Sequence, residues 1–483
     1  MWSKNKLVLI LLVLVTFLSF LKKGNHDLQE WDESRNGLNA YEMLENGDYV
    51  NLYYNGELDT WNAKPPLMIW LIAGSYKVFG FNEFALRFPS TLCTIIFFML
   101  CFYTLILLES AQTAFFTCVV LISSKAIFGN HIGLTGDFDA LLLVFITASV
   151  YFFILYVEKQ YQYGVFLTAM FTGFAFYTKG PACFVLLPGF LFYLMFRKKL
   201  KLFKDGNLWL SICLFMLIAG SWLYIGLRYG KTSEHSVYGS KNSIETMLIY
   251  DTYQRLTNPK FDNAPVVDNN YSFFLQVTDA RLNLWSYFFF LAILIGLNQL
   301  YKNKKDVFAF INQAKYRMTL LSICLIAPLS LILTFASTKH NWYLASVFMF
   351  IAFIIIKGII YVAEKWKGLY FITGLLLVFT FLRQVYYVYT LPTSIHEALA
   401  ENEKIRNQRL VMVSDRRQDI FLYLKWLNVK ILNTEDLPEA LKSEKKLYIL
   451  TSKKLLTPAK DLKIIAAKEF DNYIIGEIKK IHL

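Results

Sequence analysis

The sequence predicts an all-α polytopic membrane protein with about eleven transmembrane helices, interfacial helices and a small C-terminal α/β domain. Of the 483 residues, 56% are apolar or aromatic and 18% are charged, against about 25% charged residues in an ordinary soluble domain. Apolar runs near the length needed to cross a bilayer recur along residues 1–390. These observations exclude a soluble globular enzyme, a disordered chain and a fibrous repeat.

The charge pattern points to a lipid partner. The formal net charge is +13, which in a soluble protein would suggest nucleic acid. Here the basic residues gather in short loops between apolar runs, as in membrane proteins that fix their orientation. We therefore expect the bilayer as a partner and no nucleic acid. The six cysteines lie inside apolar runs without a CxxC pair, which indicates buried small side chains and no disulfide framework or cysteine metal site.

The apolar runs define the expected spans. The first, at about 5–21, lacks a small-residue cleavage site and precedes ten more spans, so an uncleaved anchor is favoured over a signal peptide. The others lie near 88–108, 112–129, 138–157, 162–178, 181–196, 207–227, 283–301, 318–336, 341–361 and 368–389. Residues 65–80 are apolar but short and contain Lys77, which predicts an interfacial or re-entrant helix.

Two basic loops set the expected orientation. RKKLKLFKDG at 197–206 and YKNKKDVFAFINQAKYR at 301–317 should be cytoplasmic, and so should the shorter AEKWKG loop at 363–368. Counting spans backwards places Lys4 and Lys6 inside only if 65–80 does not cross. The result is eleven crossings, an inside N-terminus and an outside C-terminal tail.

This topology places the polar motifs of the chain on the outer face. They are WDESR (31–35), NAKPP (62–66), EFALR (83–87), GDFD (136–139), TKGP (178–181), the 229–282 loop and STKHNWY (337–343). Acidic and basic residues gathered at one side of a helical bundle predict a site. We therefore expect a transmembrane domain at 1–390 whose outer loops 22–87 and 229–282 carry that site.

The tail at 391–483 reads as a separate soluble α/β domain. Residues 408–415 and 445–452 resemble strands, and 419–427 and 437–444 resemble helices. Further strands are expected at 428–432 and 463–470. The tail has no glycine-rich phosphate loop, so we assign it no catalytic role.

Asp32 and Glu33 are the candidate catalytic carboxylates. A carboxylate held near a hydroxyl can act as its general base; the alternative is a solvated loop with a helix cap. Lys64 precedes two prolines that favour a first helical turn. It is a candidate clamp for a phosphate at the headgroup level, or a snorkelling lysine.

A second group of charges lies further along the chain. Asp137 and Asp139 begin a span, where they are either helix caps or oxygen ligands of a divalent cation. Further outer-face residues are Arg87, Lys179, Arg255, Lys339 and His340, and His340 alone is given no metal role. A carboxylate pair facing several cations suits a substrate with a lipid tail, a phosphate and a polar head, as in sugar transfer from a polyprenyl phosphate.

The run WDESRNGLNAYEMLENGDYV followed by NAKPPLMIWLIAGSYKVFGFNEFALRFPS resembles the opening of bacterial glycosyltransferases. These are the enzymes related to aminoarabinose (lipid A) transferases and protein O-mannosyltransferases. GDFDALLLVFIT, YTKGPACFVLLPG and STKHNWYLA are similar to their downstream motifs. The resemblance covers roughly 25–345. It implies a GT-C fold, an undecaprenyl-phosphate-linked sugar donor, a periplasmic active site and inversion by single displacement.

The resemblance also implies residue roles. Asp32 matches the catalytic aspartate, Glu33 its neighbour and Lys64 the lysine that contacts the lipid phosphate. The expected phosphate-binding set is Lys64, Arg35, Arg87, Arg255, Lys339 and Tyr343, and the expected site-lining set is Asp137, Asp139, Lys179 and His340. Ala63 and Thr252 stand where many relatives carry an acidic residue and a histidine. These departures argue against that metal site and against assuming the aminoarabinose donor. Ala345 replaces a usual proline after Leu344. No cofactor is assigned, and a divalent cation at Asp137 and Asp139 stays open.

Several functions are compatible with the spans and the polar motifs. A transferase acting on lipid A or another glycolipid is the first choice, and a protein O-glycosyltransferase is the second. A polyprenyl-lipid transporter or flippase also explains many spans, but transporters bind near the bilayer midplane, whereas these ionisable residues gather at the outer ends of spans. A non-catalytic assembly subunit is the third option. The resemblance places the protein in the bacterial inner membrane.

Overall fold

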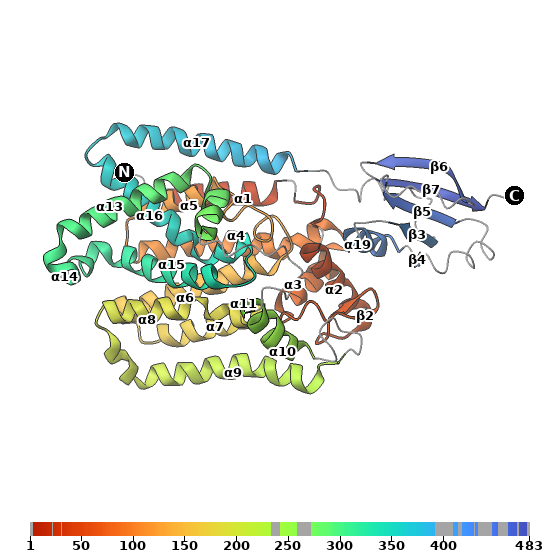
Figure 1. Cartoon of the computed structure of the whole chain (residues 1–483), viewed down its shortest axis with the longest axis horizontal. Coiled ribbons are helices and arrows are strands. Elements are labelled where there is room, and N and C mark those ends of the chain that lie inside the picture. Colours follow the sequence, from red (N-terminus) through yellow and green to blue (C-terminus); the bar gives the residue numbers. More distant parts are fainter. Residues whose placement is uncertain are drawn as a thin grey trace.

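The computed structural model describes residues 3–21, 23–29, 31–232, 242–257, 272–391, 409–413, 418–428, 430–432, 447–452, 462–470 and 473–480. Figure 1 shows long helices that run roughly parallel. Helices α2 (Asp32–Asn46), α3 (Leu67–Phe79) and α19 (Gln418–Trp426) lie at one end of this body, and α14 (Val307–Ile311) lies at the other. The two ends are chemically different, as the polar contacts below show.

The long helices form the body of the molecule. They are α1 (Lys4–Phe20), α4 (Glu83–Ile106), α5 (Ala111–Ile122), α6 (Phe138–Lys159), α7 (Gly164–Lys179), α8 (Leu187–Phe196), α9 (Gly206–Tyr229), α13 (Trp285–Lys302), α15 (Arg317–Phe335), α16 (Ala345–Ala363) and α17 (Gly368–Tyr389). Shorter elements are α10 (Ser243–Glu245), α11 (Arg255–Thr257), α12 (Phe273–Leu282), the two-residue strands β1 (Tyr53–Tyr54) and β2 (Glu57–Leu58), and a π-helix at Thr246–Gln254.

Seven helical segments of the described chain are long and apolar enough to cross a membrane. They are Glu83–Ile106, Phe138–Lys159, Gly164–Phe196, Gly206–Tyr229, Ala314–Phe335, Asn341–Ala363 and Gly368–Tyr389. The chain is therefore a multi-pass membrane protein, and the total of eleven crossings stays a prediction. Helix α3 has 13 residues, which gives about 20 Å at 1.5 Å per residue. That length is shorter than a hydrocarbon core of about 30 Å, but α5 with its 12 residues is as short, so the non-crossing assignment of 65–80 stays a prediction.

The segment Gly164–Phe196 contains two antiparallel helices, α7 and α8. Lys179, at the end of α7, pairs with Asp139 at the start of α6. Arg197, just after α8, pairs with Glu158 at the other end of α6. The chain therefore reverses between α7 and α8, as expected for two spans. The reversal begins at Gly180, whose φ of 55° suits glycine.

The expected span 112–129 is wrong at its C-terminal end. Helix α5 stops at Ile122, and residues 123–137 form a largely buried loop of turns. The hydroxyls of Ser123 and Ser124 donate to the carbonyls of Val120 and Leu121, which competes with continuation of the helix. This loop, called the 123–137 loop below, leads directly into α6.

The two strongly basic loops lie at one end of the bundle. Glu158 accepts from Arg197 at 3.0 Å and from Arg317 at 3.2 Å. Because these arginines come from the first and the second basic loop, both loops meet at the same end, as the positive-inside pattern predicts. The polar motifs described below meet at the opposite end.

The C-terminal part contains a five-stranded sheet in the order β4-β3-β5-β7-β6. Its strands are β3 (Arg409–Val413), β4 (Lys430–Leu432), β5 (Leu447–Ser452), β6 (Leu462–Phe470) and β7 (Tyr473–Lys480). β3 pairs in parallel with β4 and β5, while β7 is antiparallel to β5 and β6. The four expected strands and the expected helix at 419–427 are present. β7 was not expected, and the expected helix at 437–444 lies outside the described residues.

Helix α19 connects this sheet to the helical body by packing on α2. Leu422, Tyr423 and Trp426 are buried. The Tyr423 hydroxyl accepts the Leu28 N–H at 3.0 Å and donates to Asp27 at 3.2 Å. Gly37 of α2 makes room for this contact, because a Cβ there would lie 2.5 Å from Leu422 Cδ2.

Replacing Gly37 by alanine is expected to destabilise the protein. Overpacking typically costs about 1–3 kcal/mol, which outweighs the roughly 1 kcal/mol that alanine gains over glycine within a helix. The matched control is Gly74→Ala in α3, where nothing lies within 4 Å of the added methyl group. Thermal unfolding of the purified protein should show a lower Tm for the first variant and an equal or higher Tm for the second. Equal Tm values for both would contradict the packing of α19.

Candidate active site

The N-terminus of α2 sends two neighbouring carboxylates in different directions. The Asp32 side chain is 41% exposed, whereas that of Glu33 is fully buried. Trp31, directly before them, has a φ of 75°, a strained conformation for a bulky residue. Glu33 and the Ser34 hydroxyl both bind the backbone of Gln29, at 2.8 and 2.7 Å. These bonds hold the turn that positions Asp32.

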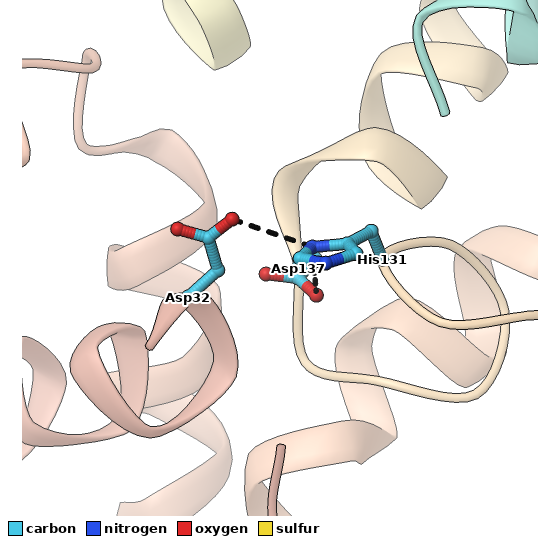
Figure 2. Close-up of side chains that lie close together, drawn as sticks. All are labelled: Asp32, His131 and Asp137. Carbon is cyan, nitrogen blue, oxygen red and sulfur yellow. Dashed lines mark ion pairs between the residues drawn. The ribbon is translucent and has the colours of Figure 1, made fainter. Parts of the chain in front are cut away.

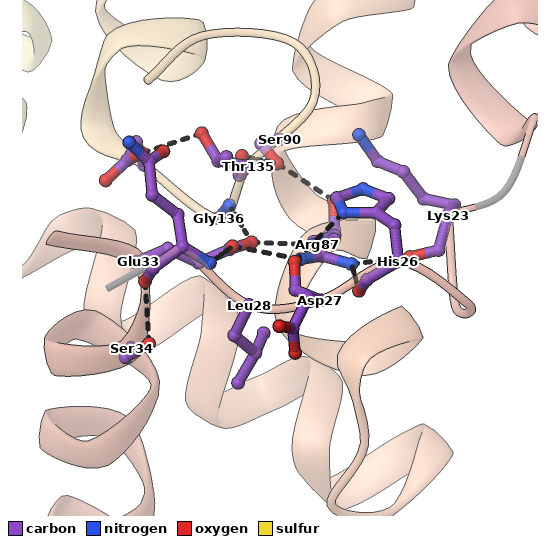
Figure 3. A network of polar contacts seen from close by, with 12 residues as sticks. Lys23, His26, Asp27, Leu28, Glu33, Ser34, Arg87, Ser90, Thr135 and Gly136 are labelled. Atoms are coloured by element: carbon purple, nitrogen blue, oxygen red, sulfur yellow. Dashed lines mark hydrogen bonds and ion pairs between the residues drawn. The ribbon is translucent and has the colours of Figure 1, made fainter. Parts of the chain in front are cut away.

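Glu33 and Arg87 form a buried ion pair (Figure 3). The guanidinium donates to both Glu33 oxygens, at 2.6 and 2.9 Å. It also donates to the carbonyls of Lys23, His26 and Asp27. The pair has no exposed side-chain surface. The expected roles of Glu33 as a catalytic carboxylate and of Arg87 as a phosphate ligand are therefore corrected. Both groups are buried and bind each other and the neighbouring backbone, so neither can reach a substrate.

The same network holds the 123–137 loop against α2. Glu33 accepts the Gly136 N–H at 2.9 Å. The buried Lys23 ammonium donates to the Gly133 carbonyl. Burial and the Arg87 charge lower the pKa of Lys23 to about 7. The segment 23–29, α2, α4 and the loop thus meet at one set of polar contacts (Figure 3).

The loop brings His131 and Asp137 to Asp32 (Figure 2). His131 Nδ1 lies 3.3 Å from Asp32 Oδ2 and 3.6 Å from Asp137 Oδ2. Asp137 also accepts from the Thr135 hydroxyl at 2.7 Å and from the Asn36 amide at 3.1 Å. The imidazole therefore sits between two carboxylates, of which Asp32 is the more exposed.

These neighbours set the charge of each group. Burial opposes ionisation of Asp32, but the His131 hydrogen bond and the Lys64 charge outweigh it and hold the pKa of Asp32 below its usual range. Burial lowers the pKa of His131, yet its contacts with Asp32 and Asp137 raise it overall. Burial raises the pKa of Asp137, and the Asp32 charge adds to this. Near neutral pH, Asp32 is thus anionic, and the contacts of His131 shift it toward the protonated form relative to a free imidazole.

Aromatic and amide groups complete the surroundings of His131. Its ring stacks on Trp342 with centroids 3.6 Å apart, and His340 stacks on Trp342 at 4.5 Å. A cation over an indole face is favourable. His131 Nε2 lies 3.0 Å from the Gln29 amide nitrogen, while the buried Gln29 amide oxygen has no partner. Turning that amide lets its oxygen accept from a protonated His131.

A cavity of about 450 Å³ opens beside this cluster. Its walls are mostly apolar and include Leu142, Ile146, Phe184, Val185, Leu329 and Leu333. Its polar lining consists mainly of Lys64, Asp139, Lys179, Asp251, Arg255 and Tyr343. An apolar pocket with a few charged groups suits an amphipathic ligand.

The cations of the cavity differ in how they are neutralised. Lys179 binds both oxygens of Asp139, at 2.7 and 2.8 Å. Arg255 pairs with Asp251 at 3.1 Å. Lys64 instead donates to the Asn62 amide oxygen at 3.3 Å and lies 5.3 Å from the centre of the Phe138 ring. Within the described residues, Lys64 is the lining cation without a carboxylate partner.

The structure separates the expected site residues into two groups. Asp32 and Asp137 meet at His131, while Lys64, Asp139, Lys179, Arg255 and Tyr343 line the cavity. Arg35 is held by Asp59 at 2.7 Å, and Lys339 donates to the Thr334 carbonyl at 2.8 Å. Neither residue lines the cavity, and the expected phosphate-binding roles of Arg35 and Lys339 stay predictions. His340 lies against Trp342 and does not line the cavity.

Sequence reasoning missed His131, Trp342 and Asp251. His131 was missed because the expected 112–129 span covered residues 123–129, so the chain just before His131 was taken for a helix and not for a loop. Gly129 and Gly133, the first and last residues of GNHIG, are the signal that marks a turn there. Asp251 lies four residues before Arg255, which is the spacing of a helical ion pair.

Asp32, His131 and Asp137 are also the described residues that could hold a metal ion together. One ligand atom from each lies within 4.8 Å of the others, and this donor set of one imidazole and two carboxylates suits zinc. The two aspartates expected to share a cation, Asp137 and Asp139, face different partners, since Asp139 binds Lys179.

Part of the chain is similar in sequence to known glycosyltransferases. Residues 63–225 match the family model of dolichyl-phosphate-mannose-protein mannosyltransferases. An uncharacterised protein of Aquifex aeolicus is 28% identical over 220 residues, covering 45% of this chain and 44% of that protein. An undecaprenyl phosphate-α-4-amino-4-deoxy-L-arabinose arabinosyl transferase of Proteus mirabilis is 28% identical over 225 residues, covering 45% and 39%. The chain thus spans less than half the length of these curated relatives.

Solved structures show the same fold over more of the chain. ArnT from Cupriavidus metallidurans, bound to undecaprenyl phosphate, has a TM-score of 0.70 at 14% identity and covers 98% of both chains. An oligosaccharyltransferase of Archaeoglobus fulgidus has a TM-score of 0.56 at 12% identity, covering 93% of this chain and 68% of the other. The chain therefore has the GT-C membrane fold of ArnT and is similar in sequence to glycosyltransferases of the ArnT and mannosyltransferase group.

Removing one partner of the Glu33–Arg87 pair is expected to destabilise the protein strongly. A buried charge left alone costs about 3–5 kcal/mol, so Arg87→Gln should lower both the Tm and the folded yield. The control is Lys231→Gln, because Lys231 is 59% exposed in its pair with Asp48 and such pairs contribute at most about 1 kcal/mol. Similar Tm losses in both variants would show that the pair does not hold the fold.

Transfer activity is expected to survive metal chelation. The neighbours that raise the pKa of His131 favour a proton there, and the lysine charges near Asp32 add to the charge balance, so EDTA should leave the rate unchanged. Added Zn²⁺ should inhibit by displacing that proton, and more strongly as the pH rises because metal binding needs a neutral imidazole. Measuring rate against EDTA and Zn²⁺ at several pH values tests this. Loss with EDTA and recovery with a divalent cation would instead identify a metal centre.

Proposed function

We propose that this protein, similar in fold to ArnT, is an inverting glycosyltransferase of the bacterial inner membrane. It moves a sugar from an undecaprenyl-phosphate-linked donor to a hydroxyl or phosphate of a periplasm-facing acceptor. The observation that carries this proposal is an apolar cavity whose charged end lies next to an ionised carboxylate. The cavity suits the lipid tail of a donor, Lys64 suits its phosphate, and Asp32 suits the attacking acceptor.

The reaction is a single displacement at the anomeric carbon. The acceptor oxygen forms a bond to that carbon while the bond from the carbon to the phosphate oxygen breaks. Asp32 takes the proton when the acceptor is a hydroxyl. The leaving group is undecaprenyl phosphate, and its growing negative charge lies near Lys64, with Lys179 and Arg255 beside it. Oxygen attack from the face opposite the phosphate inverts the carbon.

His131 is a positioning residue in this scheme. It fixes the Asp32 carboxylate by a contact of 3.3 Å and is itself held by Asp137 and Trp342. Because Asp137 is buried and keeps its proton more readily than an ordinary carboxyl group, Asp32 is the carboxylate of this trio that suits an incoming acceptor. Tyr343, which lines the same cavity, borders the phosphate region.

Lipid A or another glycolipid is the acceptor that we favour. Similarity to the arabinosyl transferases supports this choice. A protein hydroxyl is the second candidate, because the family model that matches residues 63–225 describes protein mannosyltransferases. In both cases we propose that residues 1–390 form the transferase domain and that residues 391–483 form a periplasmic domain.

Asp32→Asn is expected to lower transfer by about 10²–10⁴-fold, the usual contribution of a general base. Binding of undecaprenyl phosphate should persist, because the cavity cations are unchanged. The control is Glu57→Gln, an exposed carboxylate on the same stretch between α2 and α3. Mass spectrometry of lipid A and envelope glycoproteins from cells with each variant, and from cells lacking the protein, reads out both acceptors.

The fraction that loses a sugar identifies the acceptor. If the deletion removes a glycan that Asp32→Asn fully restores, Asp32 is not the base, and a transport or scaffold role takes its place. If Asp32→Asn and Glu57→Gln both abolish the glycan, the loss reflects folding of the outer region, and the base assignment has no support. Purified protein with labelled donor then separates transfer from transport.

A further inference from the structure

Three cations lie together on the side of the 123–137 loop that faces α17. They are Lys125 of the loop, Arg281 of α12 and Arg383 of α17. The Lys125 ammonium lies 4.1 Å from the centre of the Tyr387 ring, one helical turn beyond Arg383. Arg281 reaches the carbonyls of Lys125 and Asn130 at 3.4 Å. None of the three lines the donor cavity.

This cation cluster forms no ion pair within the described part of the chain, although the charge of Asp139, which binds Lys179, also acts on Arg281. The ion pairs found there include no carboxylate for Lys125, Arg281 or Arg383. Burial lowers the pKa of Lys125, and the charges of Arg383 and Arg281 lower it further. Arg281 is only 9% exposed. Grouping partly buried like charges is unfavourable unless an anion compensates them.

The surroundings of the cluster suit a lipid more than a soluble anion. Along α17, the apolar side chains Leu375, Phe379 and Leu382 are 57–59% exposed. They form an apolar strip on a membrane-crossing helix, next to the half-exposed Arg383. A ligand with a phosphate over the cations and acyl chains along this strip would satisfy both features.

We propose that Lys125, Arg281 and Arg383 form a second lipid-phosphate site, separate from the donor cavity. The phosphate accepts from the lysine and the two guanidinium groups, and the acyl chains lie on the exposed face of α17. The phosphate belongs either to a phosphorylated acceptor lipid or to an anionic phospholipid of the bilayer. This inference goes beyond the proposed transfer reaction, since the binding itself requires no catalysis.

The position of the cluster connects it to the candidate active site. Arg281 contacts the carbonyl of Asn130, which directly precedes His131. It lies so close to Gly129 that a Cβ there would come within 2.5 Å of its guanidinium. Gln384, beside Arg383, donates to the Phe128 carbonyl at 2.8 Å. A lipid held at the cations therefore contacts the groups that support the His131 turn.

The binding test uses the full-length protein and two lipids with the same acyl chains, phosphatidic acid and diacylglycerol. Native mass spectrometry of the wild type should show retention of phosphatidic acid over diacylglycerol. Lys125→Gln and Arg383→Gln should each weaken phosphatidic acid binding by about tenfold or more, as expected for losing one charge-assisted hydrogen bond. Lys77→Gln is the matched control, a lysine beside the Tyr49 ring and outside the cluster.

Three results would contradict the second lipid-phosphate site. Equal binding of the two lipids by the wild type, or equal phosphatidic acid binding by all variants, overturns it. Loss of undecaprenyl phosphate binding in Lys125→Gln or Arg383→Gln also overturns it, because the two sites would not be separate. Arg281→Gln is not used as a test variant, because Arg281 also binds the backbone of the 123–137 loop and its loss could disturb that loop.

A transfer assay separates the two sources of the phosphate. If the acceptor supplies it, both variants raise the KM for the acceptor about tenfold and leave kcat unchanged, as expected for lost uniform binding. If a bilayer phospholipid supplies it, the variants lose phosphatidic acid while the acceptor KM stays the same. Asp32→Asn should bind phosphatidic acid like the wild type, so a failure of the proposed transfer reaction remains distinguishable from a failure of this site.

Discussion

The buried pair of Glu33 and Arg87 is the interaction on which the candidate site depends. A charge cannot remain unpaired in a dry interior, so these two side chains fix where α2 meets α4. The remaining bonds of the same groups extend this constraint to the backbone of residues 23–29 and to Gly136. Asp32 and the 123–137 loop thus face each other because of a contact that is buried beneath them.

Charge pairing also organises the cavity. Lys179 and Arg255 each keep an aspartate beside them, whereas Lys64 contacts an amide. The resting cavity therefore carries a modest excess of positive charge, concentrated near Lys64. For the proposed donor phosphate, one cation is available at once and two already have partners. This arrangement limits the cost of burying several cations near lipid.

The sequence predicted the fold better than the site, for physical reasons. Hydropathy over about twenty residues marks membrane helices, and alternating apolar residues marked most strands of the sheet. Hydropathy failed at 112–129, where an apolar loop buried by its neighbours has the hydropathy of a membrane span. The charges of Glu33, Arg87, Arg35 and Lys339 were visible, but their burial and their partners depend on contacts between distant segments. Asp32 and Lys64 were chosen from the WDESR and NAKPP motifs, and the structure places the two charges near each other beside the cavity.

The contact between α19 and α2 has a consequence for how the protein is made. The Tyr423 hydroxyl and the Leu28 N–H are 395 residues apart in the chain. The segment that carries Asp32 emerges first during synthesis, and its packing partner is among the last parts to emerge. Until α19 has been made, the face of α2 that it covers therefore remains exposed. The contact can form only after Tyr423 has been made and has reached the side of the membrane on which Leu28 lies.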